Sequence, residues 1–414
     1  MTQSTHSNGL LRVSFMDSLR GFALLGIFIA NLEILSLYFN FRAPEGYFFS
    51  FDERVASLQA MLVEGKFYSI FSFLFGWGVA MQMKQFEAKG LNPTVMMKRR
   101  LLGMLLLGLF HLYVLWIGDI VAFYALLGFV LLLFRKKADQ ALYIWAFFLL
   151  ISPILLYALK MNFIWMNAPA GALFDLHQQL NWKLNHLKPE DAPLDLNQTR
   201  DWIHIWKHNV SDVPFRFAYL FFVSRISKVL GMFLLGYVMG RSGAYANWLQ
   251  NKNKLGRTAL IGFAIGLPMS YGMAHFGSFH EDYFNLKLNG FYYTVFYSLS
   301  VVPMAIAYMC SLGWLFHTKA GQRMLGWLQP IGKMAFTNYL LQTLTGIAVF
   351  YGVGLGLGGQ LGPTAWTVFA LGVFVLQIII SSIWLNYFQF GPVEWLWRSM
   401  TYRKWQPFRK TVPN

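Results

Sequence analysis

A histidine and an aspartate lie eight residues apart in HLYVLWIGDIVAFYAL, residues 111–126, between two strongly apolar runs. Neutral imidazole titrates close to physiological pH, so His111 is a candidate general base or nucleophile. A packed imidazole bonded to a backbone carbonyl is the structural alternative. Asp119 follows a glycine at a tight turn, where aspartate commonly caps the next helix, and substrate binding is the second interpretation for it. The sequence leaves both pairs of interpretations open.

Polar side chains at membrane depth are costly unless they face a partner or a water-filled cavity, so they are functional candidates. Asn31 follows Arg20 by eleven residues, and His111 follows Arg100 by the same interval. At about 1.5 Å per residue, both side chains lie roughly 16 Å above a basic rim. The sequence therefore predicts that His111 and Asn31, the two catalytic candidates, share one level of the protein.

A second polar pair, Asn338 and Gln342, is spaced i, i+4 on a predicted span that starts near Lys333. Side chains at this spacing share one face of a helix. The depth of the pair overlaps that of His111, and Tyr124 follows Asp119 closely in the chain. We therefore expect Asn338, Gln342, Asp119 and Tyr124 to bind substrate.

Charged side chains mark the rim at which two of these runs begin. Asp17 and Arg20 are spaced i, i+3 and can pair with each other. This pair is either structural or part of an anion-binding site. Arg99 and Arg100 begin another run, and planar guanidinium groups suit phosphate. We expect all four side chains to contribute to substrate binding.

The composition is that of an integral membrane protein. Of 414 residues, 56% are hydrophobic and only 13% are charged, whereas soluble domains average roughly 25% charged residues. We assign the net charge of +16 to cytoplasmic loops rather than to a nucleic-acid partner. The chain has one cysteine and no HExxH, GxSxG or Walker motif. We therefore expect no metal site and no hydrolase or nucleotidase chemistry of these types.

The apolar runs predict an all-α polytopic membrane protein with about ten transmembrane helices. Basic residues gather in alternate loops, which places both termini in the cytoplasm. We expect a single integral membrane domain with a five-helix half over 1–159, an external loop with short helices over 160–217, and a second five-helix half over 218–414. The predicted spans are 19–39, 67–83, 101–117, 120–134, 140–159, 218–240, 258–275, 291–316, 333–352 and 365–386.

Five segments of the chain carry a resemblance to a known family. In order along the chain they are DSLRGFALLGIFIAN, EGKFYSIFSFLFGWGVAM, RRLLGMLLLGLFHLYVLWIGDIVAFYALLG, GKMAFTNYLLQTLTG and FGPVEWLWRSMTYRKWQP. Together they resemble the YeiB-like family of bacterial inner-membrane proteins, whose C-terminal half is known as domain of unknown function 418. The resemblance covers nearly the whole chain.

At greater distance the chain is similar to transmembrane acyltransferases, including the lysosomal heparan glucosaminide N-acetyltransferase. The shared opening is a D-x-x-R-G pattern with a deeper asparagine, matched here by Asp17, Arg20, Gly21 and Asn31. This resemblance implies that an acyl group moves from cytoplasmic acyl-CoA to a sugar or lipid acceptor by way of a membrane-embedded histidine. In the acetyltransferase that histidine follows the first span. Residues 40–65 contain none here, so His111 would take over the role from another helix.

Three functions are therefore open. In an acyltransferase, Arg20, Arg99 and Arg100 would hold acyl-CoA as a co-substrate, with no permanently bound cofactor. His111 would act as base or nucleophile, and Asn31, Asn338 or Gln342 would stabilise the oxyanion. A small-solute transporter would use the same polar layer as a midplane site, although we find no inverted repeat and no broken helix pair. A non-catalytic membrane scaffold is the third function; membrane lipids and a second copy of the chain are further expected partners.

Overall fold

The computed structural model describes residues 2–38, 49–188, 195–278 and 280–410. Within these ranges the regular elements are helices. One isolated antiparallel bridge, between Phe388 and Arg409, is present in addition. Five helices contain segments that are long and apolar enough to cross a membrane. They are α1 (Thr2–Leu35), α6 (Asp139–Asn162), α11 (Lys252–Gly277), α13 (Leu288–Phe316) and α17 (Pro363–Tyr387). A bent pair, α8 (Trp202–Phe222) with α9 (Arg225–Ser242), gives a sixth candidate.

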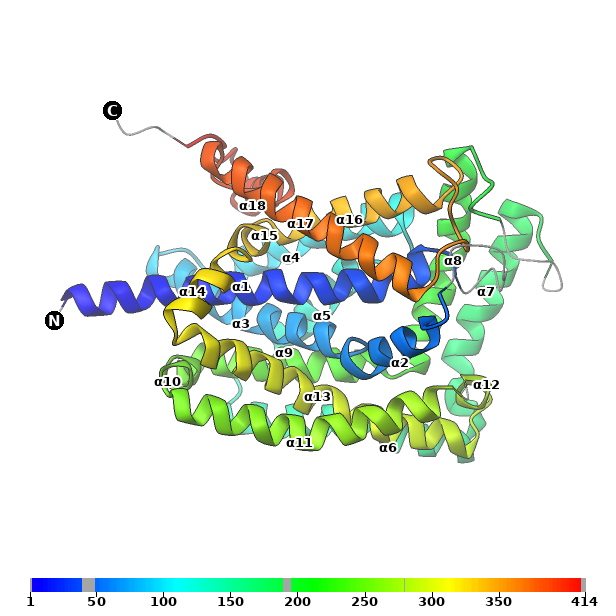
Figure 1. The fold of residues 1–414 in the computed structure, drawn as a ribbon, viewed down its shortest axis with the longest axis horizontal. Coiled ribbons are helices and arrows are strands. Elements are labelled where there is room, and N and C mark those ends of the chain that lie inside the picture. The colour runs from blue at the N-terminus through cyan, green and yellow to red at the C-terminus, as the bar shows by residue number, and fades with distance from the viewer. Residues whose placement is uncertain (1, 39–48, 189–194, 279, 411–414) are drawn as a thin grey trace.

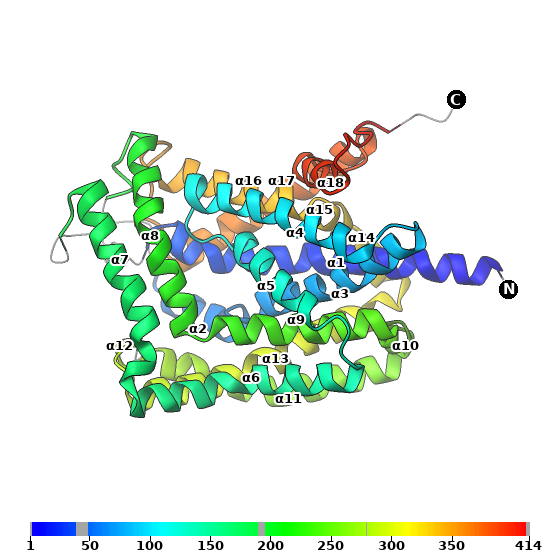
Figure 2. The same cartoon turned by 180° about the vertical axis from the view of Figure 1, so that it is seen from behind.

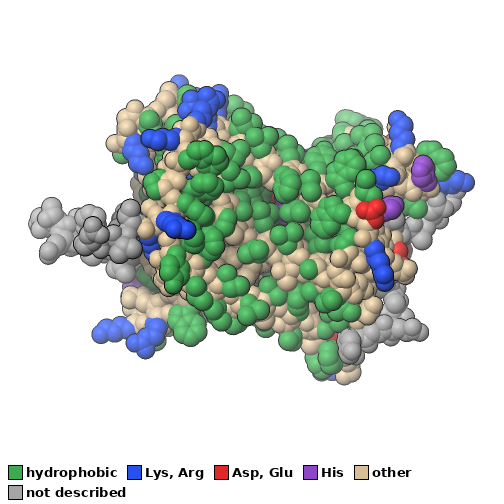
Figure 3. Space-filling model, turned by 90° about the horizontal axis from the view of Figure 1, so that it is seen from above, with side chains coloured by type: hydrophobic (Ala, Val, Ile, Leu, Met, Phe, Trp, Pro, Cys, Tyr) green, Lys and Arg blue, Asp and Glu red, His purple; other side chains and the backbone are tan. Residues whose placement is uncertain are grey.

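The protein is an elongated bundle in which further helices run beside these candidates (Figures 1 and 2). They are α3 (Lys66–Ala88), α4 (Pro93–Phe110), α5 (Val121–Leu133) and α16 (Ala335–Phe350). Hydrophobic side chains are exposed along the middle of the bundle, and Lys and Arg gather towards its two ends (Figure 3). This distribution suits a membrane protein, because lipid accepts apolar side chains and excludes charge. The expected count of ten spans stays a prediction.

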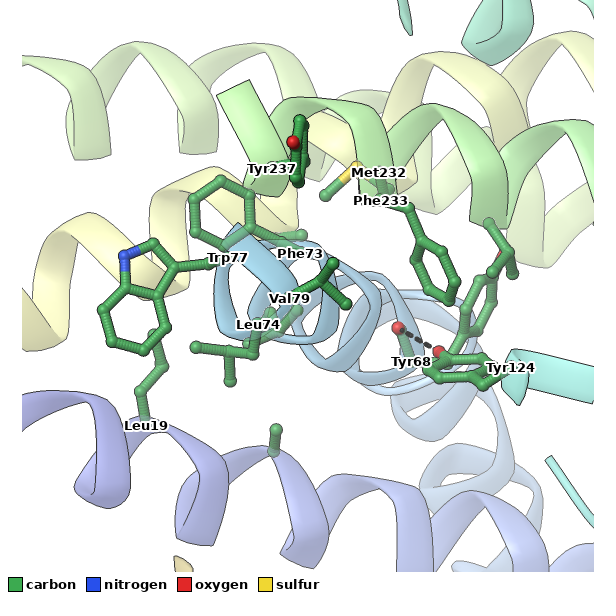
Figure 4. Packing of buried hydrophobic residues seen from close by; sticks show 14 of the residues in the cluster. Leu19, Tyr68, Phe73, Leu74, Trp77, Val79, Tyr124, Met232, Phe233 and Tyr237 are labelled. Atoms are coloured by element: carbon green, nitrogen blue, oxygen red, sulfur yellow. Dashed lines mark hydrogen bonds between the residues drawn. The ribbon is translucent and has the colours of Figure 1, made fainter. Parts of the chain in front are cut away.

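The centre of the bundle is the crossing of α3 and α9 (Figure 4). A Cβ atom at Gly236 would lie 1.9 Å from the carbonyl oxygen of Phe73, and one at Gly76 would lie 2.0 Å from that of Phe233. Only glycine permits such an approach of two backbones, as a small-xxx-small pattern at Gly236 and Gly240 predicts. Phe73 and Phe233 are buried in the largest hydrophobic cluster of the protein.

The bundle has two ends, which we name by the helices that lie there (Figure 1). The α18 end carries both chain termini together with the short helices α10 (Ala244–Gln250), α14 (Lys319–Gly326), α15 (Gln329–Lys333) and α18 (Pro392–Tyr402). The α8 end carries α2 (Asp52–Leu62), α7 (Ala168–Asn185) and α12 (His280–Phe284).

Helices α7 and α8 cross the α8 end steeply inclined to the bundle (Figure 2). The predicted external loop over 160–217 does contain helices, α7 and most of α8, and its residues 189–194 lie outside the described residues. The position of these helices outside the membrane stays a prediction. The predicted span over 218–240 is interrupted near its start, and α9 forms the rest of it. The chain bends by 68° between α8 and α9, and Ser224 at the bend has a positive φ of 52°. The ammonium group of Lys160 accounts for part of the break, because it donates to the end carbonyls of Phe221 and Phe222 at 3.3 and 2.8 Å.

Candidate functional site

His111 lies where α4 changes its hydrogen-bonding pattern. The α-helix ends at Phe110, and the π-helical turn η1 (His111–Leu115) follows, closed by Trp116 N–H donating to the His111 carbonyl at 2.8 Å. Turns of this kind are uncommon and frequently occur at functional sites. Trp116 leaves the helix with extended backbone, which lets the chain turn back towards α5. The His111 side chain is completely buried.

Asp119 returns from this turn to face His111. Its Oδ2 lies 2.9 Å from His111 Nδ1, and its Oδ1 accepts a hydrogen bond of 2.6 Å from the backbone N–H of Ala122 at the start of α5. The predicted cap of the next helix is therefore present, the contact with His111 is a role that the sequence did not indicate, and substrate binding by Asp119 stays a prediction. Asp119 caps the next helix, and it also orients the imidazole.

The other imidazole nitrogen faces α16. His111 Nε2 lies 3.0 Å from the hydroxyl of Thr343, and the ring of Tyr339 packs against the imidazole with centroids 5.0 Å apart. Residues 339 and 343 are one turn apart, so both project from the same face of α16. The structural alternative, an imidazole bonded to a backbone carbonyl, is wrong. His111 is held between a carboxylate and a hydroxyl.

Asn338 and Gln342 lie on α16 as expected, but they face α17. The Asn338 amide donates to the hydroxyl of Ser381 at 2.9 Å, and the Gln342 amide donates to Gln377 Oε1 at 3.0 Å. The Gln377 amide in turn donates to the Asn338 carbonyl. The sequence identified the correct helix and the wrong face. Residues 339 and 343, one position later, are the ones that contact His111.

The two remaining deep candidates differ in their surroundings. Asn31 is partly buried, and the described part of the chain gives it no side-chain hydrogen bond. Its neighbours on α1, Phe28 and Leu32, share a hydrophobic cluster with Trp116 beside η1, so it lies at the level of His111 as expected. The Tyr124 hydroxyl is buried and lies 2.6 Å from the hydroxyl of Ser72. The same hydroxyl donates to the Tyr68 carbonyl at 3.0 Å (Figure 4).

The rim candidates come together at the α18 end. Arg20 and Asp17 form an ion pair of 2.6 Å. The guanidinium group of Arg100 stacks on the ring of Trp397 in α18, with 3.6 Å between Cζ and the ring centroid. Arg20 and Arg398 both lie within electrostatic range of Arg100, so these three form a basic group. The guanidinium of Arg99 meets only the sulfur of Met96, at 3.9 Å, among the described residues.

The FGPVEWLW segment holds this rim to the bundle. Glu394 accepts hydrogen bonds from the backbone N–H groups of Phe336 and Thr337 at the start of α16, at 2.7 and 3.1 Å. Trp397 donates to the Arg100 carbonyl at 2.7 Å. If the protein were a scaffold, this C-terminal segment could contact a partner protein. Its Glu394 and Trp397 side chains are, however, already bonded within the protein.

Sequence reasoning missed two sets of side chains. Thr343 and Tyr339 are small or aromatic residues on an apolar helix, and nothing in their spacing points to His111. The second set is Arg216, Arg225 and Lys228, on both sides of the bend between α8 and α9. His111 was a candidate because it is a polar residue next to an apolar run. The same criterion applies equally to Arg225 and Lys228.

Comparison with known proteins gives the family of the chain. The family described as "Protein of unknown function (DUF418)" matches residues 239–404. "Uncharacterized protein YxaH" of Bacillus subtilis (strain 168) is 32% identical over 411 residues, which cover 96% of each chain. "Uncharacterized protein YeiB" of Escherichia coli (strain K12) is 26% identical and covers 94% of this chain and 96% of its own. No solved structure matches. The chain belongs to the YeiB-like DUF418 family.

Proposed function

We propose that the protein is an acyltransferase of the bacterial inner membrane, which moves an acyl group from cytoplasmic acyl-CoA to a sugar or lipid acceptor of the cell envelope. The observation that carries this proposal is the buried chain of Asp119, His111 and Thr343, with contacts of 2.9 and 3.0 Å. A carboxylate, an imidazole and a hydroxyl in this order are the parts of a general-base site.

Asp119 determines which imidazole nitrogen is basic. An ionised carboxylate accepts a hydrogen bond from Nδ1–H, so the proton of neutral His111 resides on Nδ1. The lone pair of Nε2 then points at a hydroxyl, that of Thr343 in this state. An acceptor hydroxyl at the same place would give its proton to Nε2 while its oxygen attacks the thioester carbonyl of acyl-CoA.

The remaining step returns the site to its starting state. The attack forms a carbon–oxygen bond, and the carbon–sulfur bond of the thioester then breaks. The proton held on Nε2 passes to the departing sulfur, so the products are the acylated acceptor and free CoA thiol. Asp119 stabilises the imidazolium ion between these two transfers. Partly buried Asn31, at the same level and without a hydrogen-bonding partner in the described ranges, suits donation to the oxyanion.

The proposed topology places the α18 end in the cytoplasm, with ten spans and both termini inside. Acyl-CoA would then meet Arg20, Arg99 and Arg100 through its phosphates. His111 follows Arg100 by eleven residues along α4, which is roughly 16 Å at 1.5 Å per residue. Because His111 is fully buried, the side chains around it, Tyr339 among them, must move to admit the substrates.

The test is acyl transfer by the purified full-length protein in lipid nanodiscs. The assay follows release of CoA thiol from acetyl-CoA in the presence of an extract of envelope glycans and lipids. We expect His111→Ala to lower the rate by about 10²–10⁴-fold, the usual contribution of a general base. Thr345→Ala is a matched control on α16, since Thr345 is only half-buried and its hydroxyl bonds only to its own helix in the described structure. Full activity of the His111→Ala variant would exclude the mechanism.

A small-solute transporter is the second candidate. The 68° bend between α8 and α9 supports it, because transporters bind substrates at broken helices. The expectation that the two halves carry no matching pair of broken helices stays a prediction. Solute uptake by proteoliposomes without acyl-CoA would favour this function, and His111→Ala would then alter uptake rather than thiol release.

A further inference from the structure

Three cationic side chains gather at the bend between α8 and α9. Arg216 lies near the end of α8, and Arg225 and Lys228 lie in the first turn of α9. Arg225 lies within electrostatic range of both Arg216 and Lys228, so the three positive charges act on one another. We call them the bend cations.

The bend cations lack the partners that buried charges normally have. Across the described ranges none of them forms an ion pair or a side-chain hydrogen bond, and the Nε atoms of Arg216 and Arg225 are buried without a hydrogen-bond acceptor. Lys228 is only 9% exposed, and Arg216 and Arg225 are partly buried. Buried charged groups are usually paired, because removing a charge from water without compensation is very unfavourable.

Two tyrosine rings support the bend cations from one side. The guanidinium carbon of Arg225 lies 4.4 Å from the ring centroid of Tyr68, and the ammonium nitrogen of Lys228 lies 3.9 Å from that of Tyr297. The Tyr297 hydroxyl donates to that of Tyr68 at 3.2 Å, which joins the two rings. Gly65, with φ of 80°, makes room for them, since a Cβ atom there would lie 2.6 Å from the Tyr297 oxygen. Arg225 and Lys228 are thus held in place against two tyrosine rings.

Nearby carboxylates do not balance this charge. Glu64 acts on Arg225 and Lys228, but it accepts a hydrogen bond of 2.7 Å from Tyr293. Asp119 acts on Arg216 while its two oxygens are occupied by His111 and Ala122 N–H. Three cations therefore face two carboxylates, of which Asp119 has both oxygens and Glu64 has one oxygen bonded elsewhere, and a positive surplus remains.

We propose that Arg216, Arg225 and Lys228 form a site that binds the phosphate group of a molecule entering from the α8 end. Guanidinium groups present parallel N–H donors that match two phosphate oxygens, and an ammonium group adds a compact charge. The first backbone N–H groups of α9, a helix of 18 residues, add positive potential at the same place. This site is independent of acyl transfer. If both occur, the electrostatic link between Arg216 and Asp119 places the phosphate beside the catalytic pair.

The phosphate has two chemical sources, a phospholipid headgroup or a soluble phosphorylated compound. The experiment measures the thermal unfolding temperature of the full-length protein in a non-ionic detergent. One arm titrates inorganic phosphate against chloride at equal ionic strength. The other adds phosphatidylglycerol to the micelles, with phosphatidylcholine for comparison. We expect a concentration-dependent rise in Tm with phosphate, with phosphatidylglycerol, or with both. A response to the lipid alone identifies a headgroup site, and a response to inorganic phosphate identifies a site open to soluble compounds.

The variants are Arg225→Gln and Lys228→Gln, each expected to weaken the apparent affinity about tenfold or more, as loss of a charged hydrogen bond does. Lys207→Gln is the matched control, because Lys207 lies on α8 nine residues before Arg216, roughly 13 Å away along the helix. It should bind as the unchanged protein does. If a glutamine variant does not fold, Arg225→Lys keeps the charge, removes the parallel donors and should show the same direction. Absence of a response in the unchanged protein, or equal weakening in the Lys207 variant, would overturn the proposal.

Discussion

The two ends of the bundle treat positive charge differently. At the α18 end Arg20 pairs with Asp17 at 2.6 Å, and Arg100 stacks on Trp397. At the α8 end Arg225 and Lys228 touch aromatic rings, but no carboxylate pairs with them in the described part of the chain. Both ends are rich in arginine, so the sequence alone does not distinguish them.

The difference separates structural charges from candidate ligand-binding charges. Arg100, like the bend cations, has an aromatic contact and no ion pair among the described residues, but Trp397 also donates to its backbone carbonyl, so the two residues join α4 to α18. A buried cation without a partner lowers stability unless something else binds to it. His111 and Asp119 lie close to the second group, through the link between Asp119 and Arg216, and yet they are fully paired with each other.

The largest expected loss of stability concerns Asp119. Both oxygens of this carboxylate, which lies near the bend cations, accept or share hydrogen bonds. Asp119→Ala leaves Nδ1–H of buried His111 without an acceptor and removes the cap of α5. We expect a loss of about 2–4 kcal/mol, the sum of an unsatisfied buried donor and a lost cap. Thermal unfolding measures it.

Asp119→Asn is the control for that prediction. Asparagine keeps an oxygen for the Ala122 N–H and offers an amide to the other tautomer of His111, so the loss should be clearly smaller. Equal losses in the two variants would show that neither hydrogen bond contributes to stability.

The contacts of Asp119 and His111 separate the features that the sequence predicts from those that it does not. Hydropathy predicted an all-helical membrane protein and helices over one face, because those features follow from local composition. It predicted the level of His111 from helix rise alone. Thr343 was out of reach, since it lies 232 residues from His111 in the chain and threonine is common in membrane helices. Capping by Asp119 was predicted from its place at a tight turn, whereas its contact with His111 was not.

The bend explains the other failure. Helix breaks are usually signalled by proline or glycine, and the chain here breaks at Val223 and Ser224. Without such a signal, the apolar run over 218–240 predicts a span but not the bend that brings Arg225 and Lys228 beside Arg216. The face of α16 was a similar problem. Asn338 with Gln342 and Tyr339 with Thr343 have the same spacing, and only packing against α17 decides which pair turns away from His111.

A pair of substitutions tests the comparison between the ends directly. Arg100→Met removes a guanidinium group that stacks on Trp397, and we expect a loss of about 1–2 kcal/mol. Lys228→Met removes a buried cation that forms no ion pair among the described residues, so in phosphate-free buffer Tm should stay unchanged or rise. The measurement is thermal unfolding of both variants in one detergent. A drop of similar size in the Lys228 variant would mean that the cation–π contact with Tyr297 satisfies that charge.

The smallest effect belongs to a carboxylate of the α8 end that does have a cationic partner. Asp282 in α12 accepts from the Asn289 amide at 2.7 Å and pairs with Lys287 at 3.0 Å, and these contacts hold its pKa below the ordinary value. A depressed folded-state pKa stabilises the protein above the ordinary pKa, and that contribution disappears as the pH falls through the folded-state pKa. Asp282→Asn should therefore lower Tm slightly at pH 7, and the difference should fade as the pH falls below the ordinary pKa of aspartate, about 4. Glu281→Gln is the control, because Glu281, next to Asp282 in the chain, is exposed and has no side-chain partner among the described residues. If the Tm difference between Asp282→Asn and the unchanged protein persists in acid, Asp282 stabilises the α8 end through packing contacts. Its negative charge would then make no contribution.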